Sequence, residues 1–385
     1  MKLSNLARNM GGSAIRAMYN EALKMTDTVS FTVGEPDFIT PQVVIDEACD
    51  AWQRGLTHYT PNAGIPELRQ AIAEYHKDDL KPDFQSEILV TCGAMESLQL
   101  ALLTLADPAD EVILITPAWA NYFGHIAMCG AKLKEVRVTE ETDFVPTVEQ
   151  VRQAITPKTK LIMINSPSNP TGAVIDAETL KGLAELVVEH DLFAISDEIY
   201  SRLVYDRLKY TSITSFPGMR ERTVYISGFS KMFAMTGWRL GYTIANPDII
   251  RAMTKLHENS ASCLPAPTQL AGARALRDCQ DDVDRMRDIY EKRRNLIFDL
   301  VSDMPGVKVK KPKGAFYLFV SIKELGIKSA DFCMDLLRKT GVVTVPGTGF
   351  GDAGEGYIRI TYATSDENII EGMRRMKQYL VEKLG

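Results

Sequence analysis

The stretch KLIMINSPSNPTGAVIDAETLKGLAELVVEHDLFAISDEIY, residues 160–200, contains two short β-rich runs separated by a helical segment. The runs KLIMIN and LFAIS are apolar almost throughout, as strands that are buried on both faces require. The segment between them includes AETLKGLAELVVEH, which is typical of a helix that connects one strand to the next. This order predicts parallel strands that are covered by helices.

The same alternation continues on both sides of this stretch. The runs SEILVT at 86–91, EVILIT at 111–116 and RTVYIS at 222–227 are separated by helical segments such as AMESLQLALLTLA at 94–106. From about residue 85 to residue 245, the sequence therefore predicts an α/β fold with a mostly parallel sheet sandwiched by helices.

A helical pattern replaces this alternation after Pro247. The segment 281–304 has apolar residues near helical spacing, which indicates one long amphipathic helix. The chain beyond it mixes β-rich and helical runs, while the N-terminal segment has no sheet of its own. We therefore expect a large domain over residues 45–285 and a smaller α+β domain that is built from both termini, residues 1–44 and 286–385.

Composition and charge exclude several classes of function. The 385 residues carry a formal net charge of -6, so the chain lacks the basic surface that binds nucleic acid or anionic membranes. No apolar stretch is long enough for a secretory signal or a membrane helix, and we expect a cytoplasmic protein. The six cysteines form no CxxC pair and the five histidines form no HExxH motif, so we expect no metal.

Chemically distinctive residues follow the ends of the predicted strands, where open α/β sheets bind their ligands. Gly93 follows SEILVT and starts a helix, whose free N–H groups can bind an anion. Trp119 follows EVILIT, Asn169 lies in a proline-bounded loop after KLIMIN, and Asp197 follows LFAIS. Each residue also has an ordinary structural explanation, as a steric glycine, a core tryptophan, a turn or a helix cap.

A lysine and an arginine complete this set. Lys231 follows RTVYIS, where partial burial would lower its pKa and make it an amine nucleophile, and Arg239 lies eight residues later. Taken together, the residues provide a phosphate site, a stacking surface, a carboxylate for a ring nitrogen and an amine for a carbonyl. That combination predicts pyridoxal 5'-phosphate as the cofactor.

The chain also contains a series of ordered motifs: GEPDF at 34–38, YTPNAG at 59–64, PAW at 117–119, NSPSNPTG at 165–172, SDEIY at 196–200, SGFSKMFAMTGWRLGY at 227–242, KGAFYLF at 313–319 and YIRITYA at 357–363. With these motifs the sequence resembles the pyridoxal-phosphate-dependent aminotransferases of fold type I, in the class I/II group of aspartate and aromatic aminotransferases. The resemblance covers almost the whole chain.

The resemblance implies a role for each matching residue. Lys231 would form the internal Schiff base and move the substrate proton, and Asp197 would hold the cofactor's ring nitrogen protonated. The other cofactor contacts would come from Tyr200 and Asn169 at the ring oxygen, Trp119 at the ring face, and Gly93, Ala94, Met95, Ser230 and Arg239 at the phosphate. Arg359, with Gly34 and Asn169, would bind the substrate carboxylate. Tyr59 would reach the phosphate of a neighbouring subunit, which implies a homodimer with shared sites.

The implied reaction transfers an amino group from an L-amino acid to a 2-oxo acid such as 2-oxoglutarate, with ping-pong kinetics. Two departures from the family pattern bear on this reaction. Some members have a phosphate-binding serine where Gly228 stands, so Ser230 or the backbone must substitute for it. Dicarboxylate-specific members have an arginine within the segment matching 260–269 or a lysine at Met95, and this chain has neither. An aromatic or neutral donor is therefore favoured over aspartate, and Arg16 is left as a candidate contact for a distal carboxylate.

Other functions remain as alternatives to transamination. A carbon–sulfur β-lyase would use the same lysine and aspartate. A non-catalytic regulator that binds pyridoxal phosphate would carry out neither transamination nor β-elimination. The glycines at 347–351 superficially suggest a nicotinamide fingerprint, but no helix is expected to follow them. The segment GFSKM at 228–232 lacks the final glycine of a serine-hydrolase elbow.

Overall fold

A seven-stranded sheet forms the centre of the computed structural model, which describes residues 2–12 and 14–384. Its strand order is β2-β8-β7-β6-β5-β3-β4, and only β8 runs antiparallel to its neighbours. The strands are β2 (Ile88–Thr91), β3 (Glu111–Thr116), β4 (Lys132–Arg137), β5 (Thr159–Asn165), β6 (Phe193–Asp197), β7 (Thr223–Gly228) and β8 (Gly241–Ile244). The mostly parallel sheet that the sequence predicts is therefore confirmed.

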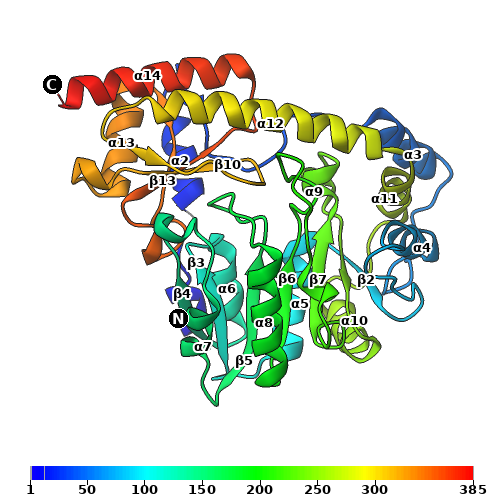
Figure 1. Ribbon diagram of the computed structural model, residues 1–385. Helices are drawn as coiled ribbons and strands as arrows, with labels where there is room; N and C mark the ends of the chain where they lie inside the picture. The colour runs from blue at the N-terminus through cyan, green and yellow to red at the C-terminus, as the bar shows by residue number, and fades with distance from the viewer. Residues whose placement is uncertain (1, 13, 385) are drawn as a thin grey trace.

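Helices cover both faces of this sheet (Figure 1). Alternate residues of one strand enter different cores, since Leu114 packs with side chains from α5, α6 and α10, whereas Ile113 packs with side chains from α7 and α8. These helices are α5 (Gly93–Leu105), α6 (Ala120–Met128), α7 (Val148–Ala154), α8 (Ala177–Glu189) and α10 (Pro247–Ser260). Burial on both faces explains why the central strands are apolar throughout.

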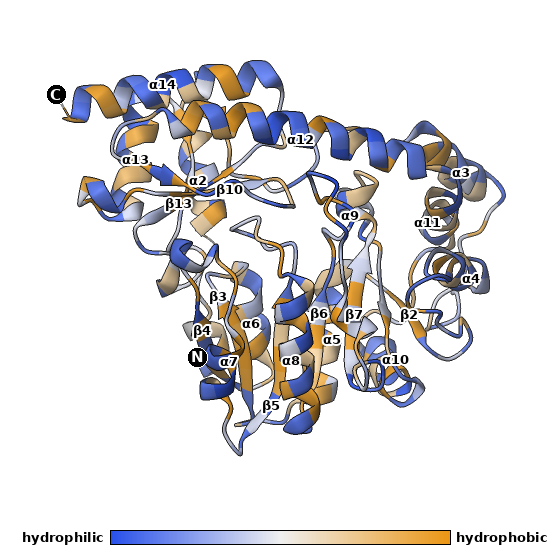
Figure 2. Ribbon diagram, viewed as in Figure 1, coloured by the Kyte–Doolittle hydropathy of each residue, from blue (hydrophilic) through white to orange (hydrophobic). Residues whose placement is uncertain are grey.

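Beyond the β2 edge, α3 (Gln42–Gln53), α4 (Pro66–Tyr75) and α11 (Ala266–Asp278) pack against one another and surround a further core. Figure 1 shows them as a separate cluster beside the sheet. In Figure 2 the buried strands are largely orange, whereas the outer faces of the surrounding helices carry the blue, hydrophilic residues. The hydropathy pattern thus matches a sheet enclosed between helical layers.

A second, four-stranded sheet lies above the carboxyl ends of the large one (Figure 1). Its antiparallel order is β12-β13-β10-β9, formed by β9 (Lys308–Val309), β10 (Tyr317–Ser321), β12 (Val345–Pro346) and β13 (Tyr357–Thr361). It is accompanied by α12 (Gln280–Ser302), α13 (Ser329–Thr340) and α14 (Asp366–Leu384). The long helix predicted at 281–304 is therefore confirmed as α12.

Part of the N-terminal segment joins this upper layer. It comprises α2 (Ala14–Ala22) and β1 (Val29–Ser30), and β1 pairs in parallel with β11 (Val342–Val343), whereas α1 (Asn5–Asn9) lies lower, beside the large sheet (Figure 1). Both ends of the chain thus contribute to one core, which includes Phe31 and Met376. The domain limits of 45–285 and 1–44 with 286–385 stay a prediction, because α12 runs continuously across residue 285.

Two features bear on the excluded functions. The glycine-rich stretch after β12 leads only into a short 3-10 turn, Asp352–Gly354, so it does not have the strand-turn-helix form of a dinucleotide site. Within the described part of the chain, no helix has the length and apolar character needed to cross a membrane.

Candidate active site

A cavity opens between the two sheets, at the carboxyl ends of the central strands. It encloses about 770 Å³, its open mouth included, which is enough for a small cofactor and substrate. The predicted site residues that line it are Gly34, Ala94, Met95, Trp119, Asn169, Asp197, Tyr200, Ser230, Lys231, Arg239 and Arg359. Residues from five strand ends and from both terminal segments therefore meet in one place.

Lys231 enters the cavity from α9 (Phe229–Met232), a single helical turn that directly follows β7. The buried side chains of Phe229 and Met232 anchor this turn in the core and so leave Lys231 facing the cavity. Its Nζ donates a hydrogen bond of 2.5 Å to the carbonyl oxygen of Gly34. Burial lowers the pKa of Lys231 to about 8, with Glu35 acting in the opposite direction. A lysine with this pKa supplies much more neutral amine near neutral pH than a surface lysine does.

Asp197 ends β6 and is only 3% exposed. The hydroxyl of Tyr122 donates to its Oδ2 at 2.8 Å, and the N–H of Ile199 donates to its Oδ1 at 3.2 Å. Burial raises the pKa of Asp197 to about 6, while these two hydrogen bonds lower it. The sequence pattern did not single out Tyr122. It lies on α6 three residues after Trp119, which precedes the helix as its N-cap, and the two ring centroids are 5.4 Å apart, so closeness to Trp119 in the sequence was the available signal.

Arg359 lies on β13 and is 1% exposed. It donates from Nη1 to Oδ1 of Asn169 at 3.0 Å and from Nη2 to the carbonyl oxygen of Thr32, and its guanidinium lies 4.6 Å from the ring centroid of Tyr317. Among the described residues, its Nε has no hydrogen-bond partner and no carboxylate pairs with it. A buried cation without a counterion is costly, so this arginine is suited to bind an anionic ligand.

Two tyrosines meet at the centre of the cavity. The hydroxyls of Tyr200 and Tyr317 share a hydrogen bond of 2.8 Å, and both side chains are buried. Burial raises the pKa of both phenols, so both are protonated and can donate. Tyr317 is a second site residue that the sequence analysis missed, although it lies within the quoted motif at 313–319.

The start of α5 lies at one end of the cavity and has the groups that an anion site requires. Gly93 has a φ of +72°, and a Cβ at this position would lie 2.7 Å from Nη2 of Arg239. Glycine therefore allows the guanidinium to reach the first turn of the helix, where N–H groups have no partners within the helix. Gly228 has a different reason to be glycine, because a Cβ there would lie 3.0 Å from the Cα of Gly241 on the paired strand β8. A side chain at position 228 would therefore press on the paired strand, whereas Ser230 lines the cavity.

The remaining predicted contacts lie elsewhere. Tyr59 does not line this cavity and is 92% exposed, on a hollow of the surface that it shares with Trp52 and Leu56. Arg16 is exposed, with its guanidinium 5.7 Å from the ring centroid of Tyr19, and its neighbour Ile15 lines the cavity in its place.

Comparison with known proteins is consistent with this geometry. Residues 26–376 match the family model described as aminotransferase class I and II. Aspartate aminotransferase of Pyrococcus abyssi is 43% identical over 100% of this chain and 99% of its own, and aromatic-amino-acid aminotransferase 2 of Thermococcus litoralis is 41% identical over the same shares. A solved structure of Pyrococcus protein-A1 has a TM-score of 0.97 at 42% identity and covers 100% of both chains. The family resemblance inferred from the motifs is confirmed.

Proposed function

The chain belongs to the class I and II aminotransferases, and from this premise we propose how its own residues carry out transamination and on which substrates. The observation that carries the proposal is the buried Lys231 of lowered pKa, which shares one cavity with Asp197 and Arg359. Relatives that are named aminotransferases over the full length do not favour the β-lyase alternative, and Arg359 has no evident task in a regulator.

The cavity fits pyridoxal 5'-phosphate at each of its functional groups. The turn from Gly93 to Met95, with Ser230 and Arg239, supplies donors and positive charge for the phosphate. The ring would lie against Trp119, with its nitrogen at Asp197 and its oxygen at Tyr200 and Asn169. A protonated ring nitrogen also suits Asp197, because it provides a cationic partner for a carboxylate that burial otherwise disfavours as an anion.

When bound, the cofactor supplies a carbonyl that condenses with amino groups and a ring that accepts electrons from the bond broken at the substrate Cα. Lys231 would hold the cofactor at that carbon until an amino acid takes its place, and its freed amine would then carry the Cα proton. Asp197 keeps the proton on the ring nitrogen. Arg359 binds the substrate carboxylate through its guanidinium, next to Gly34, and thereby fixes the Cα near Lys231.

The lowered pKa of Lys231 makes a prediction about cofactor capture. The neutral amine is the reactive form, and with a pKa of about 8 roughly a tenth of the lysine is neutral at pH 7. The rate at which cofactor-free protein takes up pyridoxal phosphate is expected to rise with pH and to level off above about pH 8, measured by stopped-flow absorbance between pH 6 and 10. A rate that still climbs steadily to pH 10 is the behaviour of an ordinary lysine and contradicts the assignment.

The amino donor that we propose is aromatic or neutral, with aspartate as the alternative. Of the described residues that line the cavity, the cations are Lys231, Arg239 and Arg359, and each already has a task. The other lining side chains include Ile15 and Met95, which favour an apolar substituent. The full-length relatives are named for aspartate and for aromatic amino acids at nearly equal identity, so the names alone do not choose between them.

A half-reaction with single amino acids tests the function and the donor together. Cofactor-loaded protein is mixed with phenylalanine, leucine, methionine, aspartate or glutamate in the absence of a 2-oxo acid, and the 2-oxo acid formed is quantified by mass spectrometry. We expect one equivalent per chain, at least about tenfold faster from phenylalanine than from aspartate. Aspartate and glutamate reacting alone would reverse the donor assignment. Pyruvate from cystathionine, with no half-reaction from any amino acid, would replace transamination by β-elimination.

We further propose a homodimer in the cytoplasm, in which Tyr59 reaches the phosphate end of the neighbouring cavity. Its hydroxyl-bearing side chain is 92% exposed, and the large apolar side chains of Trp52 and Leu56 beside it are exposed as well. Exposed aromatic and apolar groups of this kind are enriched where subunits meet.

A further inference from the structure

The segment from Pro312 to Tyr317 contacts the three parts of the chain that carry Asn169, Tyr200 and Arg359. The N–H groups of Lys313 and Gly314 both donate to the carbonyl oxygen of Gly172, in the loop that follows Asn169. The N–H of Ala315 donates to the carbonyl oxygen of Leu203, in the chain that follows Tyr200. At its end, Tyr317 pairs with Thr361 in the antiparallel register of β10 and β13, the strand of Arg359.

At the end of this segment, the side chain of Tyr317 lines the cavity. The Tyr317 hydroxyl hydrogen-bonds that of Tyr200 at 2.8 Å, and its ring lies 4.6 Å from the guanidinium of Arg359. One side chain thus contacts both the tyrosine proposed for the cofactor ring and the arginine proposed for the substrate carboxylate. A small displacement of the segment would move both groups.

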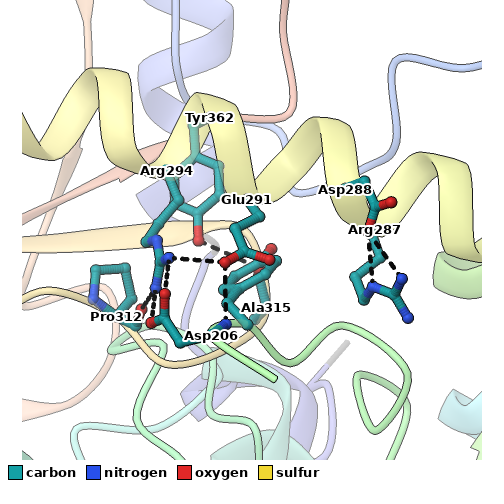
Figure 3. A network of polar contacts seen from close by, with 9 residues as sticks. Asp206, Arg287, Asp288, Glu291, Arg294, Pro312, Ala315 and Tyr362 are labelled. Atoms are coloured by element: carbon teal, nitrogen blue, oxygen red, sulfur yellow. Dashed lines mark hydrogen bonds and ion pairs between the residues drawn. The ribbon is translucent and has the colours of Figure 1, made fainter. Parts of the chain in front are cut away.

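An ion pair between a buried arginine and a half-exposed aspartate lies at the beginning of the segment (Figure 3). Arg294 on α12 has a side chain that is 0% exposed, and it grips Asp206 in a bidentate fork, with Nη1 to Oδ2 at 2.7 Å and Nη2 to Oδ1 at 2.8 Å. The same Nη1 donates to the carbonyl oxygen of Pro312 at 3.1 Å. Glu291, one turn earlier on α12, accepts the N–H of Asp206 at 3.0 Å. The fork therefore ties α12 to the loop after β6 and to the first residue of the segment.

Two tyrosines hold the segment further along, at Ala315. The hydroxyls of Tyr205 and Tyr362 both donate to the carbonyl oxygen of Ala315. Tyr205 also lies beneath the guanidinium of Arg294, at 5.0 Å from its ring centroid. Ala315 has a φ of 55°, a conformation that a non-glycine residue adopts only when its surroundings impose it. The hydroxyls of Tyr205 and Tyr362 and the carbonyl oxygen of Leu203 therefore hold this backbone in place, and Arg294 acts on it through its contact with the Tyr205 ring.

We propose that Arg294 and Asp206 are positioning residues for the active site: their fork fixes the Pro312–Tyr317 segment and so sets the orientation of Tyr317 between Tyr200 and Arg359. This inference rests on the proposed function for the roles of Tyr200 and Arg359. It assigns a catalytic consequence to an ion pair that touches neither cofactor nor substrate. The bidentate geometry matters because two bonds to Asp206 fix the plane of the Arg294 guanidinium, and with it the direction of the bond from Nη1 to the carbonyl oxygen of Pro312.

The test uses Asp206→Asn, Arg294→Lys and the control Arg287→Gln, each as cofactor-loaded protein. The side chain of Asp206 is 58% exposed, so its isosteric replacement preserves the fold, while Arg294→Lys keeps the charge but loses the fork. Arg287 is also on α12 and ion-paired, to Asp284 and Asp288, but its contacts do not reach the segment (Figure 3). Three quantities are measured at a temperature well below the thermal transition of each protein.

The first quantity is the hydrogen exchange rate of the amides at residues 313–315. The second is the dissociation constant of a carboxylate, either 3-phenylpropionate or succinate, whichever binds the wild-type protein more tightly. The third is the pair kcat and KM per bound cofactor. Both fork variants are expected to exchange faster, bind the carboxylate about tenfold more weakly and lose between about 10- and 100-fold in kcat/KM, with Arg287→Gln like wild type. Variants that only melt earlier, with unchanged carboxylate binding and kcat/KM, would overturn the inference. Wild type that transaminates no amino acid would instead overturn the proposed function, and exchange and carboxylate binding would still report on the fork.

Discussion

Replacing Lys231 with alanine is expected to lower transaminase turnover by about 10⁴-fold or more, the largest effect of any single substitution in this chain. In the proposed function the same side chain holds the cofactor and moves the substrate proton, and general acid–base catalysis alone contributes about 10²- to 10⁴-fold. Its Nζ already lies in the cavity, 2.5 Å from the carbonyl oxygen of Gly34 and between groups that would bind both ends of the ligand. Single-turnover formation of the 2-oxo acid measures the loss.

A matched control separates this role from the loss of a positive charge. Lys181 is an exposed lysine on α8, ion-paired with Glu185 at 4.0 Å, and Lys181→Ala is expected to retain wild-type turnover. Circular dichroism checks that both variants are folded. A Lys231→Ala protein that is folded, contains cofactor and turns over within tenfold of wild type would remove Lys231 from the mechanism.

The substitution Asp197→Asn is expected to reduce turnover by about 10²- to 10³-fold and to weaken cofactor binding, because it replaces the buried charge that we propose as the partner of the ring nitrogen by a neutral amide. The amide retains the size of the carboxylate and can still accept the hydrogen bond from Tyr122, so the fold and the local packing should persist. Turnover is measured at saturating substrate, and the dissociation constant of pyridoxal phosphate by fluorescence quenching.

The neighbouring carboxyl group provides the control. Glu198 is also buried, at 2% exposed, but its Oε1 accepts hydrogen bonds from Ser196 and Ser212 and it does not line the cavity. Burial raises the pKa of Glu198 to about 7, so Glu198→Gln mimics a form that the wild-type protein already populates near neutral pH. It should keep nearly full turnover. Equal losses in the two variants would mean that Asp197 acts through structure rather than through its charge at the ring.

The sequence predicted the parts of the fold that hydrophobic burial alone determines. Strands β2, β3, β5, β6 and β7 are apolar runs between helices, and all of them were identified. Strand β4 was missed because KLKEVR is charged and mostly not buried, as an edge strand can be, and β8 because GYTI contains a glycine and a threonine and follows a turn. Neither carries enough apolar pattern to be separated from a loop.

The site residues also divide into those that the sequence pattern locates and those that only tertiary packing brings to the cavity. Strand ends located Asp197 and Lys231, because the carboxyl ends of parallel strands meet at one edge of the sheet. Tyr122 and Tyr317 were missed because a tyrosine in an apolar run has the pattern of a core residue, and its hydroxyl partner is fixed only by tertiary packing. The contact between Arg359 and Asn169 spans 190 residues and could not be seen in the spacing of either motif. The position after a predicted strand had singled out Asn169, motif resemblance supplied Arg359, and the structure supplied their geometry.

The most direct test of the central claim is to locate the cofactor on the chain. Protein loaded with pyridoxal phosphate is reduced with borohydride, which fixes the cofactor to the amino group that holds it, and is then digested and mapped by mass spectrometry. The proposed function predicts one phosphopyridoxyl group per chain, on Lys231 in the peptide that follows β7, and none in a sample first converted by an excess of a reactive amino acid. Attachment to another lysine, or no specific attachment, would contradict it.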